Sequence, residues 1–278
     1  MAARFWVGGT GTWDASSTAN WSATSGGAGG ASVPTSADSV TIDAASGSGT
    51  ITVNTNFTIT TFTTGAMNMT LDFSVNNNSP TIGTLNFAGT GTRTINMGNG
   101  VWTFTGTVFT ANNFTNCTLN QGNSSVVCTN TSTNSLTISL TNFPLYWNKF
   151  TFNRGYSIGT IAINMGTTGG GINTIIDNGA TSHLITFQQN RNTYVDNFQI
   201  NGGTASTPIT LGSNGGIAGI IKITPGIINF DYIAGNGSTL NVSPANTWYY
   251  SANVSVPPTG TGWNATMPAR KLGASGAG

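Results

Sequence analysis

Apolar and polar residues alternate in short runs along most of the chain. In the segment Leu71–Val75, for example, three apolar side chains are separated by Asp72 and Ser74. Alternation with a period of two puts every second side chain on one face, which is typical of a half-buried β-strand. The same pattern predicts strands at 51–53, 71–75, 85–87, 95–97, 136–140, 150–152, 161–163, 198–200, 209–211 and 240–242.

The residues within and between these runs also favour strands and turns. The polar residues inside the runs are mostly Thr, Asn and Ser, and the branched side chain of Thr favours the extended backbone. Gly and Asn between the runs tolerate the left-handed conformation that tight turns require. No long segment carries apolar residues at the helical spacing of i, i+3, i+4 and i+7. We therefore expect an all-β chain.

Short strands at this spacing are compatible with two all-β architectures. Runs of three to five residues recur roughly every 8–14 residues, which fits a β-solenoid (a β-helix of stacked coils) or a β-sandwich such as a jelly roll. A sandwich typically closes after about 100 residues. Here the pattern continues from about residue 42 to residue 256 without a change in composition. Its length favours the solenoid, and the sandwich is the alternative.

The chain has very few charged residues. Of 278 residues, eight are Lys or Arg and seven are Asp, so charged residues make up 5%, against about 25% in an average soluble domain. In a solenoid, each side chain stacks about 4.8 Å from its equivalent in the next coil. A charge repeated in every coil would repel its copy, whereas Asn and Thr can hydrogen-bond to theirs. The low charge therefore also favours stacked coils.

Charge and hydropathy exclude several functional classes. Eight dispersed cations do not form the basic surface that nucleic-acid binding requires, so we expect no nucleic-acid partner. No run of 18 or more apolar residues is present, which argues against insertion into a membrane. Because no apolar segment follows Arg4, we also expect no secretory signal peptide and synthesis in a cytoplasm.

Composition divides the chain into three segments. Residues 1–45 are rich in Trp and Gly, and we expect them to cap the solenoid, because an open coil exposes strand edges and apolar core. Residues 46–256 form the predicted solenoid body. Residues 257–278 are rich in Pro and Gly and are expected to form an extended arm.

No residue pattern predicts a catalytic site, a cofactor or a metal site. Glycoside hydrolysis needs two carboxylates on the order of 5–9.5 Å apart, and only Asp38 and Asp43 are close in sequence. On a regular strand they would point to opposite faces, and we expect Asp38 to accept a backbone hydrogen bond in a turn. Carboxylates distant in sequence could still meet on adjacent coils. The one histidine, His183, has only Ser182 beside it and is expected to be a polar loop residue.

Two glycine-rich motifs and two cysteines complete the candidates for chemistry. Residues 8–14 (GGTGTWD) differ from a calcium-binding nonapeptide because the Asp comes one position late and the motif does not repeat. Residues 165–171 lack the Gly-Lys-Ser/Thr of a phosphate-binding loop. Cys117 and Cys128 lie in strand-like runs, and we expect small buried side chains with free thiols, with a disulfide as the alternative.

Aromatic side chains are the strongest candidates for contacts with other molecules. Trp248, Tyr249 and Tyr250 are consecutive, so on a strand at least one ring should face outward. Exposed rings pack in protein interfaces and can contact sugars, while buried rings pack in the core. The candidates for an interface or a glycan contact are Trp6, Trp13, Trp21, Trp248, Tyr249, Tyr250 and Trp263.

Several motifs resemble those of a group of tailed-bacteriophage virion proteins. Members of that group often open with Trp-Val-Gly-Gly-x-Gly-x-Trp and continue with a Pro-x-x-x-Asp-x-Val strand. Residues 6–13 (WVGGTGTW) and 34–40 (PTSADSV) match both motifs. Residues 91–106 (GTRTINMGNGVWTFTG) and the stretch 187–263 also look like the repeats of that group. The likeness spans nearly the whole chain, except for the residues after Trp263.

The resemblance implies a β-helical structural or tail-fibre-like protein, and it brings no catalytic residues. We therefore expect a non-enzymatic virion protein in an external appendage, either a host-adhesion element or a capsid decoration. The expected partners are further copies of the chain in a homotrimer, other phage structural proteins and a host-surface glycan. Two alternatives are a phage polysaccharide depolymerase and a secreted bacterial adhesin or surface-filament protein.

Overall fold

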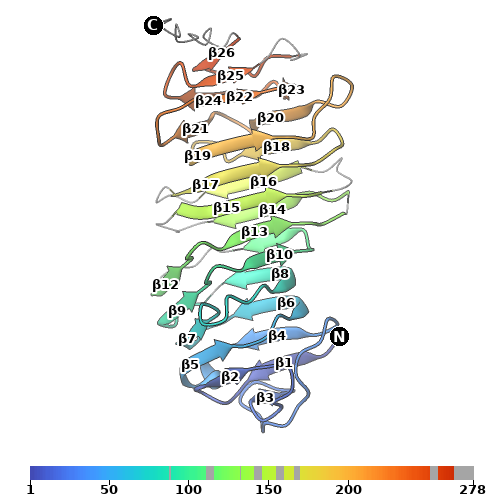
Figure 1. Cartoon of the computed structure of the whole chain (residues 1–278), viewed down its shortest axis with the longest axis vertical. Coiled ribbons are helices and arrows are strands. Elements are labelled where there is room, and N and C mark those ends of the chain that lie inside the picture. Colours follow the sequence, from blue (N-terminus) through green and yellow to red (C-terminus); the bar gives the residue numbers. More distant parts are fainter. Residues whose placement is uncertain are drawn as a thin grey trace, which may run out of the picture.

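The chain folds into a long stack of short β-strands (Figure 1). The computed structural model describes residues 1–87, 89–110, 116–131, 133–140, 146–154, 160–165, 170–250 and 256–265. These residues contain 26 strands, one short 3-10 helix (η1, Ala44–Ser46) and no α-helix. The prediction of an all-β chain is therefore confirmed.

The strands follow one another with short connections. The first twelve are β1 (Ala3–Trp6), β2 (Gly11–Trp13), β3 (Trp21–Ser22), β4 (Ser39–Ile42), β5 (Ser48–Val53), β6 (Thr58–Thr64), β7 (Asn68–Asp72), β8 (Thr81–Phe87), β9 (Arg93–Asn96), β10 (Val101–Phe104), β11 (Val108–Thr110) and β12 (Cys117–Asn120). The next seven are β13 (Ser125–Cys128), β14 (Leu136–Leu140), β15 (Tyr146–Phe152), β16 (Thr160–Met165), β17 (Gly170–Asp177), β18 (Leu184–Phe187) and β19 (Asn192–Ile200). The last are β20 (Ile209–Ser213), β21 (Ala218–Lys222), β22 (Ile228–Phe230), β23 (Ile233–Gly235), β24 (Leu240–Ser243), β25 (Trp248–Tyr250) and β26 (Trp263–Asn264).

Strand pairing shows a parallel β-solenoid. Among the described residues, every strand pair is parallel except β1 with β3. The longest ladder runs β4-β6-β8-β10-β13-β15-β17-β19-β21-β24, and a second runs β8-β11-β14-β16-β18-β20-β23. A sandwich would instead pack two antiparallel sheets face to face. The predicted solenoid is confirmed, and the sandwich alternative is excluded.

Glycine allows two faces of the solenoid to meet at a sharp corner. In the single strand β8, Ile82 pairs with Phe104 of β10 while Leu85 pairs with Phe109 of β11, so the strand covers both faces. In the next coil Gly106 separates β10 from β11. A Cβ atom on Gly106 would lie 1.9 Å from the carbonyl oxygen of the glycine in β8. Only glycine fits where the coils approach this closely.

Apolar side chains stack in continuous rows inside the coils. One row consists of Phe62, Leu85, Phe109, Ile138, Ile163 and Phe187, each at most 1% exposed. Each member pairs with its equivalent in the next coil, so the inward positions of the period-two pattern build one column of core. Full burial of such a side chain contributes about 1.5–3 kcal/mol, which makes this column the main stabilising feature of the rod.

Neutral polar side chains form a second kind of row on the outside. The amide nitrogen Nδ2 of Asn178 donates to Oδ1 of Asn153 at 2.7 Å, and Nδ2 of Asn201 donates to Oδ1 of Asn178 at 2.8 Å. The amide of Asn120 bonds to Oδ1 of Asn96 in the same way, at 2.8 Å. Because a side-chain amide is both a donor and an acceptor, such a row of hydrogen bonds can continue from coil to coil. The expectation that uncharged side chains bond between coils is therefore confirmed.

Three tryptophans of the N-terminal segment, residues 1–45, form a cluster. The rings of Trp6 and Trp21 meet edge to face with centroids 5.2 Å apart, and those of Trp13 and Trp21 do so at 4.9 Å. Trp13 also stacks on Phe57 at 4.1 Å. All three tryptophans are at most 1% exposed. The cluster lies at the N-terminal end of the apolar column and covers it.

The last described residues continue the stack of coils. Strand β26 pairs in parallel with β25, and the backbone amide of Leu240 donates to the carbonyl of Thr259 at 2.7 Å. Residues 257–265, the first part of the predicted arm, are thus paired with the final coil. The rest of that arm, residues 266–278, lies outside the described residues.

Candidate ligand-binding surface

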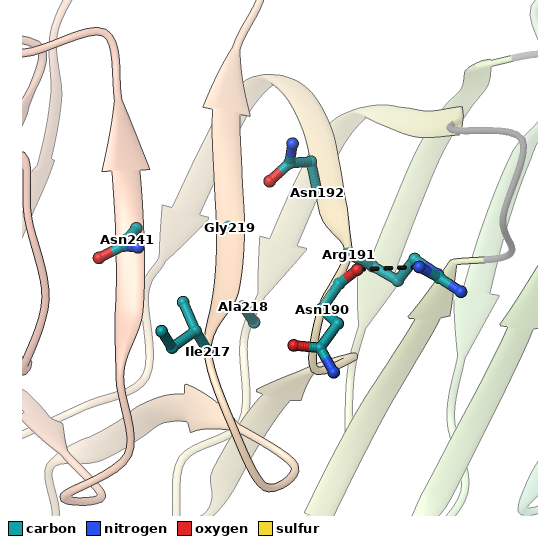
Figure 2. A pocket seen from close by; sticks show the side chains of 7 residues that line it. All are labelled: Asn190, Arg191, Asn192, Ile217, Ala218, Gly219 and Asn241. Atoms are coloured by element: carbon teal, nitrogen blue, oxygen red, sulfur yellow. Dashed lines mark hydrogen bonds between the residues drawn. The ribbon is translucent and has the colours of Figure 1, made fainter.

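An open depression lies where three successive parallel strands begin (Figure 2). Its volume is about 350 Å³. The lining residues belong to the starts of β19, β21 and β24 and the turns before them; they are Asn190, Arg191, Asn192, Ile217, Ala218, Gly219 and Asn241. The strand register pairs Asn192 with Gly219 and Gly219 with Asn241, so residues distant in sequence meet in one row. We refer to it as the Gly219 depression.

The missing side chain at Gly219 lets the side chain of Asn192 pack across the strand. Asn192 and Asn241 flank this glycine from the coils on either side (Figure 2). A Cβ atom on Gly219 would lie 2.1 Å from Oδ1 of Asn192. Ala218 is buried beneath the surface, and Ile217 is 54% exposed at the margin. The result is a hollow with amide walls and one apolar edge.

Two amides of the depression are not used by the protein itself. Among the described residues, the side chains of Asn190 and Asn192 make no hydrogen bond to another group. By contrast, Oδ1 of Asn241 accepts from the backbone amide and the hydroxyl of Thr261, at 2.9 and 3.1 Å. Other asparagines, such as Asn178, are bonded between coils, whereas these two side chains are not. They leave donors and acceptors available to a ligand.

The depression carries no charge at its centre. Arg191 lies at its rim, and its side chain extends away from Gly219 and Asn241 (Figure 2). Its Nη1 donates to the carbonyl oxygen of Asn190 at 3.0 Å. No carboxylate of the described residues pairs with this guanidinium. The polar groups that face the hollow are therefore neutral amides.

A second amide-lined depression lies toward the N-terminal end of the same ladder. It has a volume of about 600 Å³ and is lined by Leu119, Asn120, Gln121, Gly122, Asn123, Asn148 and Asn173. Two of its side chains bond within the protein: Oε1 of Gln121 accepts from the backbone amide of Asn148 at 2.9 Å, and Nδ2 of Asn148 donates to the Ser124 carbonyl at 3.0 Å.

Most of the aromatic residues expected to contact other molecules are buried within the chain. Trp6, Trp13, Trp21, Trp248 and Tyr249 are at most 3% exposed. Tyr250 and Trp263 are only partly buried and pack against the core. Of the seven candidates, Tyr250 and Trp263 are therefore the two that keep part of their surface exposed. The depressions, lined by amides, were not found from the sequence.

Most of the carboxylates have structural roles. Asp38 accepts from the backbone amide and the hydroxyl of Thr35, at 3.0 and 2.8 Å. The bond from the backbone amide is the one that the sequence predicted. Asp43 caps helix η1. Asp14 accepts from the backbone amides of Ser17 and Ser16, and these bonds lower its pKa. Asp72 and Asp177 likewise accept from the backbone amides of Ser74 and Gly179, and Asp196 accepts from the hydroxyl of Thr224.

A buried ion pair corrects the expectation for His183. His183 does lie in a loop, between β17 and β18, but it is buried there. Its Nε2 lies 3.1 Å from Oδ2 of Asp177, and both side chains are completely buried. Nδ1 lies 2.7 Å from the carbonyl oxygen of Thr181. Asp177 itself occupies a core row, paired with Phe152 and Ile200. Because solvent does not reach the pair, its role is structural.

The sequence does contain a signal for this ion pair. In β17 the buried residues alternate, and Ile175 faces the core. A period of two then places Asp177 on the same inward face. A carboxylate at a core position needs a partner, and His183 is the nearest basic residue in sequence.

Both cysteines are free thiols. Cys128 is fully buried, and burial raises the pKa of its thiol to about 12. Burial also raises the pKa of Cys117. The expectation of free thiols is confirmed, and neither group has the lowered pKa of a reactive cysteine.

In the part of the chain that the structure describes, no group of three or more His, Cys or Asp side chains is arranged to hold a metal ion. The same residues contain no helix of the length and apolarity needed to span a membrane. Most of the glycine-rich segment 165–171 lies outside the described residues.

Comparisons with known proteins identified no relative. A scan against protein-family models, a search of curated proteins and a search of solved structures each returned no match.

Proposed function

We propose that this chain is a structural, non-enzymatic protein of a bacteriophage virion, located in an external appendage. The appendage would be a tail-fibre-like adhesion element or a capsid decoration. The observation that carries the proposal is the column of parallel coils, bonded between coils by neutral side chains and covered by tryptophans at one end. The assignment to a bacteriophage virion rests on the resemblance of residues 6–13 and 34–40 to motifs of virion proteins.

The column suits a mechanical role. Each coil is joined to the next by parallel backbone hydrogen bonds and by a continuous apolar core. Such a body is stiff along its axis, because bending must break contacts in several coils at once. It also offers long faces on which repeated contacts with a partner can form. A rod of this kind holds a receptor-binding surface away from the particle that carries it.

The carboxylates support a non-enzymatic role. A depolymerase of the glycosidase type needs an acid and a second carboxylate facing a common sugar. Six of the seven Asp side chains are instead hydrogen-bonded within turns, a helix cap or a buried ion pair. We therefore favour adhesion over cleavage.

The proposed assembly is a homotrimer that also contacts other phage structural proteins. Two exposed apolar side chains, Ile223 and Ile227, lie together in the turn between β21 and β22 and are 46% and 51% exposed. These are suitable for contacts between copies of the chain. A trimer would also multiply weak receptor contacts through effective concentration.

Labelling of intact particles tests the proposal. An antibody raised against the recombinant chain, detected by gold particles, should decorate the outside of purified virions at a fixed position. Mass spectrometry of the same particles should find the chain in a constant ratio to the capsid protein. Absence of the chain from purified particles would refute the viral role. Native mass spectrometry of the recombinant protein tests the trimer separately.

A further inference from the structure

We propose that the Gly219 depression binds an uncharged, polyhydroxylated ligand: a short segment of a neutral polysaccharide. The inference rests on the proposed function for the source of the ligand, a cell-surface glycan, and goes beyond it in naming the site and the ligand class. It is carried by the side chains that face the hollow and by its shape.

The chemistry of the walls matches sugar hydroxyls. A carboxamide has two N–H donors and a carbonyl acceptor, and a hydroxyl is likewise both donor and acceptor. The amides of Asn190 and Asn192 make no bond within the described part of the chain and so can bond to adjacent hydroxyls of one sugar. This contrasts with Asn178, whose amide is bonded to the coils on both sides. Amides that take no part in such ladders can hydrogen-bond to a ligand.

The absence of charge selects against acidic glycans. A uronate or sialic acid is normally held by a cation, typically the planar fork of an arginine. Here Arg191 turns away from the hollow and bonds to the carbonyl of Asn190 (Figure 2). Amides at the centre bind neutral hydroxyls without paying the desolvation of an unpaired charge. The site should therefore prefer a neutral sugar to its carboxylated analogue.

The shape also fits a sugar unit. A volume of about 350 Å³ lies in the range of about 300–1,000 Å³ found for small-ligand sites. Ile217, 54% exposed at the edge, offers an apolar surface to the C–H face of a sugar ring. The floor is the backbone of Gly219, where a Cβ atom would collide with Asn192. Any side chain at this position would reshape the hollow.

Binding to a printed array of neutral, sialylated and uronate-containing oligosaccharides tests the inference on the full chain. We expect the wild-type signals to be confined to neutral glycans. The double variant Asn190→Gly/Asn192→Ala should lose at least tenfold in signal. Glycine keeps the left-handed backbone of position 190 (φ 57°) without strain, and neither amide bonds within the described part of the chain, so the Tm should change little. Asn197→Ala, on strand β19 but outside the depression, is the matched control and should bind like wild type.

Three outcomes would overturn the inference: no wild-type binding, a preference for acidic glycans, or equal binding by the double variant. They are distinguishable from failure of the proposed function. A chain found on virions that binds no array glycan refutes this inference alone. A chain absent from virions whose neutral-glycan binding depends on Asn190 and Asn192 refutes the viral role alone.

Discussion

The imidazole of His183 packs against the carboxylate of Asp177 in the core of the solenoid, with Nε2 and Oδ2 3.1 Å apart. Its other nitrogen, Nδ1, faces the carbonyl oxygen of Thr181 at 2.7 Å. Both ring nitrogens thus face acceptors. Only the doubly protonated imidazolium can donate to both. The folded protein therefore favours the charged form of a histidine that no solvent reaches.

Stability should fall as the pH rises above the ordinary range of histidine. Burial lowers the pKa of His183, but the hydrogen bond and charge of Asp177 outweigh it, so the folded-state pKa is raised above 6.5. A basic group whose pKa is higher in the folded state than in the unfolded state stabilises the fold. This stabilisation is fully present below the pKa of the unfolded state and is lost as the pH rises through the pKa of the folded state. Each unit of elevation contributes about 1.4 kcal/mol. Thermal unfolding at constant ionic strength should show a Tm that declines above about pH 6.5.

The variant His183→Gln is the control for this pH dependence. It lacks the titrating group, so its Tm should be lower than that of wild type at pH 6 and should change less between pH 6 and 9. A wild-type Tm that rises over this interval, or a variant with the same profile as wild type, would contradict the ion-pair account.

Introducing repeated charge should destabilise the ladder of Asn153, Asn178 and Asn201. The triple change to Asp removes two side-chain hydrogen bonds, each contributing about 1 kcal/mol. It also places like charges on neighbouring coils, where repulsion at about 4.8 Å costs about 1 kcal/mol per pair. We expect a loss of about 3–4 kcal/mol in urea unfolding at low salt, with partial recovery in 1 M NaCl because salt screens repulsion.

The triple change to Ala separates the two effects. It removes the same hydrogen bonds but adds no charge, so it should cost about 2 kcal/mol at either salt concentration. If the Asp variant showed no more salt response than the Ala variant, repulsion between coils would not explain the low charge of this chain.

Replacing Gly202 with Ala should force two coils apart. A Cβ atom on Gly202 would lie 1.8 Å from the carbonyl oxygen of Gly179, and this contact involves backbone that cannot rotate away. We expect a loss of about 1–3 kcal/mol in the free energy of unfolding. Gly216→Ala is the control, because the nearest atom to its Cβ is 3.5 Å away, and it should change stability by less than about 0.5 kcal/mol. Equal effects of the two changes would rule out the steric explanation.

Modification of Cys128 should report on unfolding. Its side chain is fully buried, and burial raises the pKa of the thiol to about 12. The reactive thiolate is therefore scarce at pH 8. In a Cys117→Ser background, a thiol reagent such as DTNB should react with Cys128 only at urea concentrations where circular dichroism shows loss of strands. Rapid, complete reaction in native buffer would show that this part of the core opens independently.

The period-two pattern was enough to predict an all-β chain, because it depends only on local alternation. Runs such as Leu136–Leu140 identify an inward and an outward face without knowledge of the neighbouring coil. The scarcity of charge and the abundance of Asn and Thr indicated that similar side chains would stack. The first inference depends only on the two faces of a single strand, and the second depends only on the stacking of similar strands.

The candidate site could not be predicted in this way. Coils of the body differ in length, with paired residues 20 positions apart for Ile51 and Leu71 but 29 apart for Phe109 and Ile138. Which residues share a row therefore depends on loop lengths and corner geometry, and these are set by packing. The register that places Gly219 between Asn192 and Asn241 is one result.

Local chemistry thus determined that this chain forms a column of strands joined by neutral side chains. Tertiary structure decided which tryptophans are buried, which amides remain free of the ladders, and that His183 turns inward to meet Asp177. The physical reason is that alternation is a property of one strand, whereas a row across coils depends on every connection that precedes it.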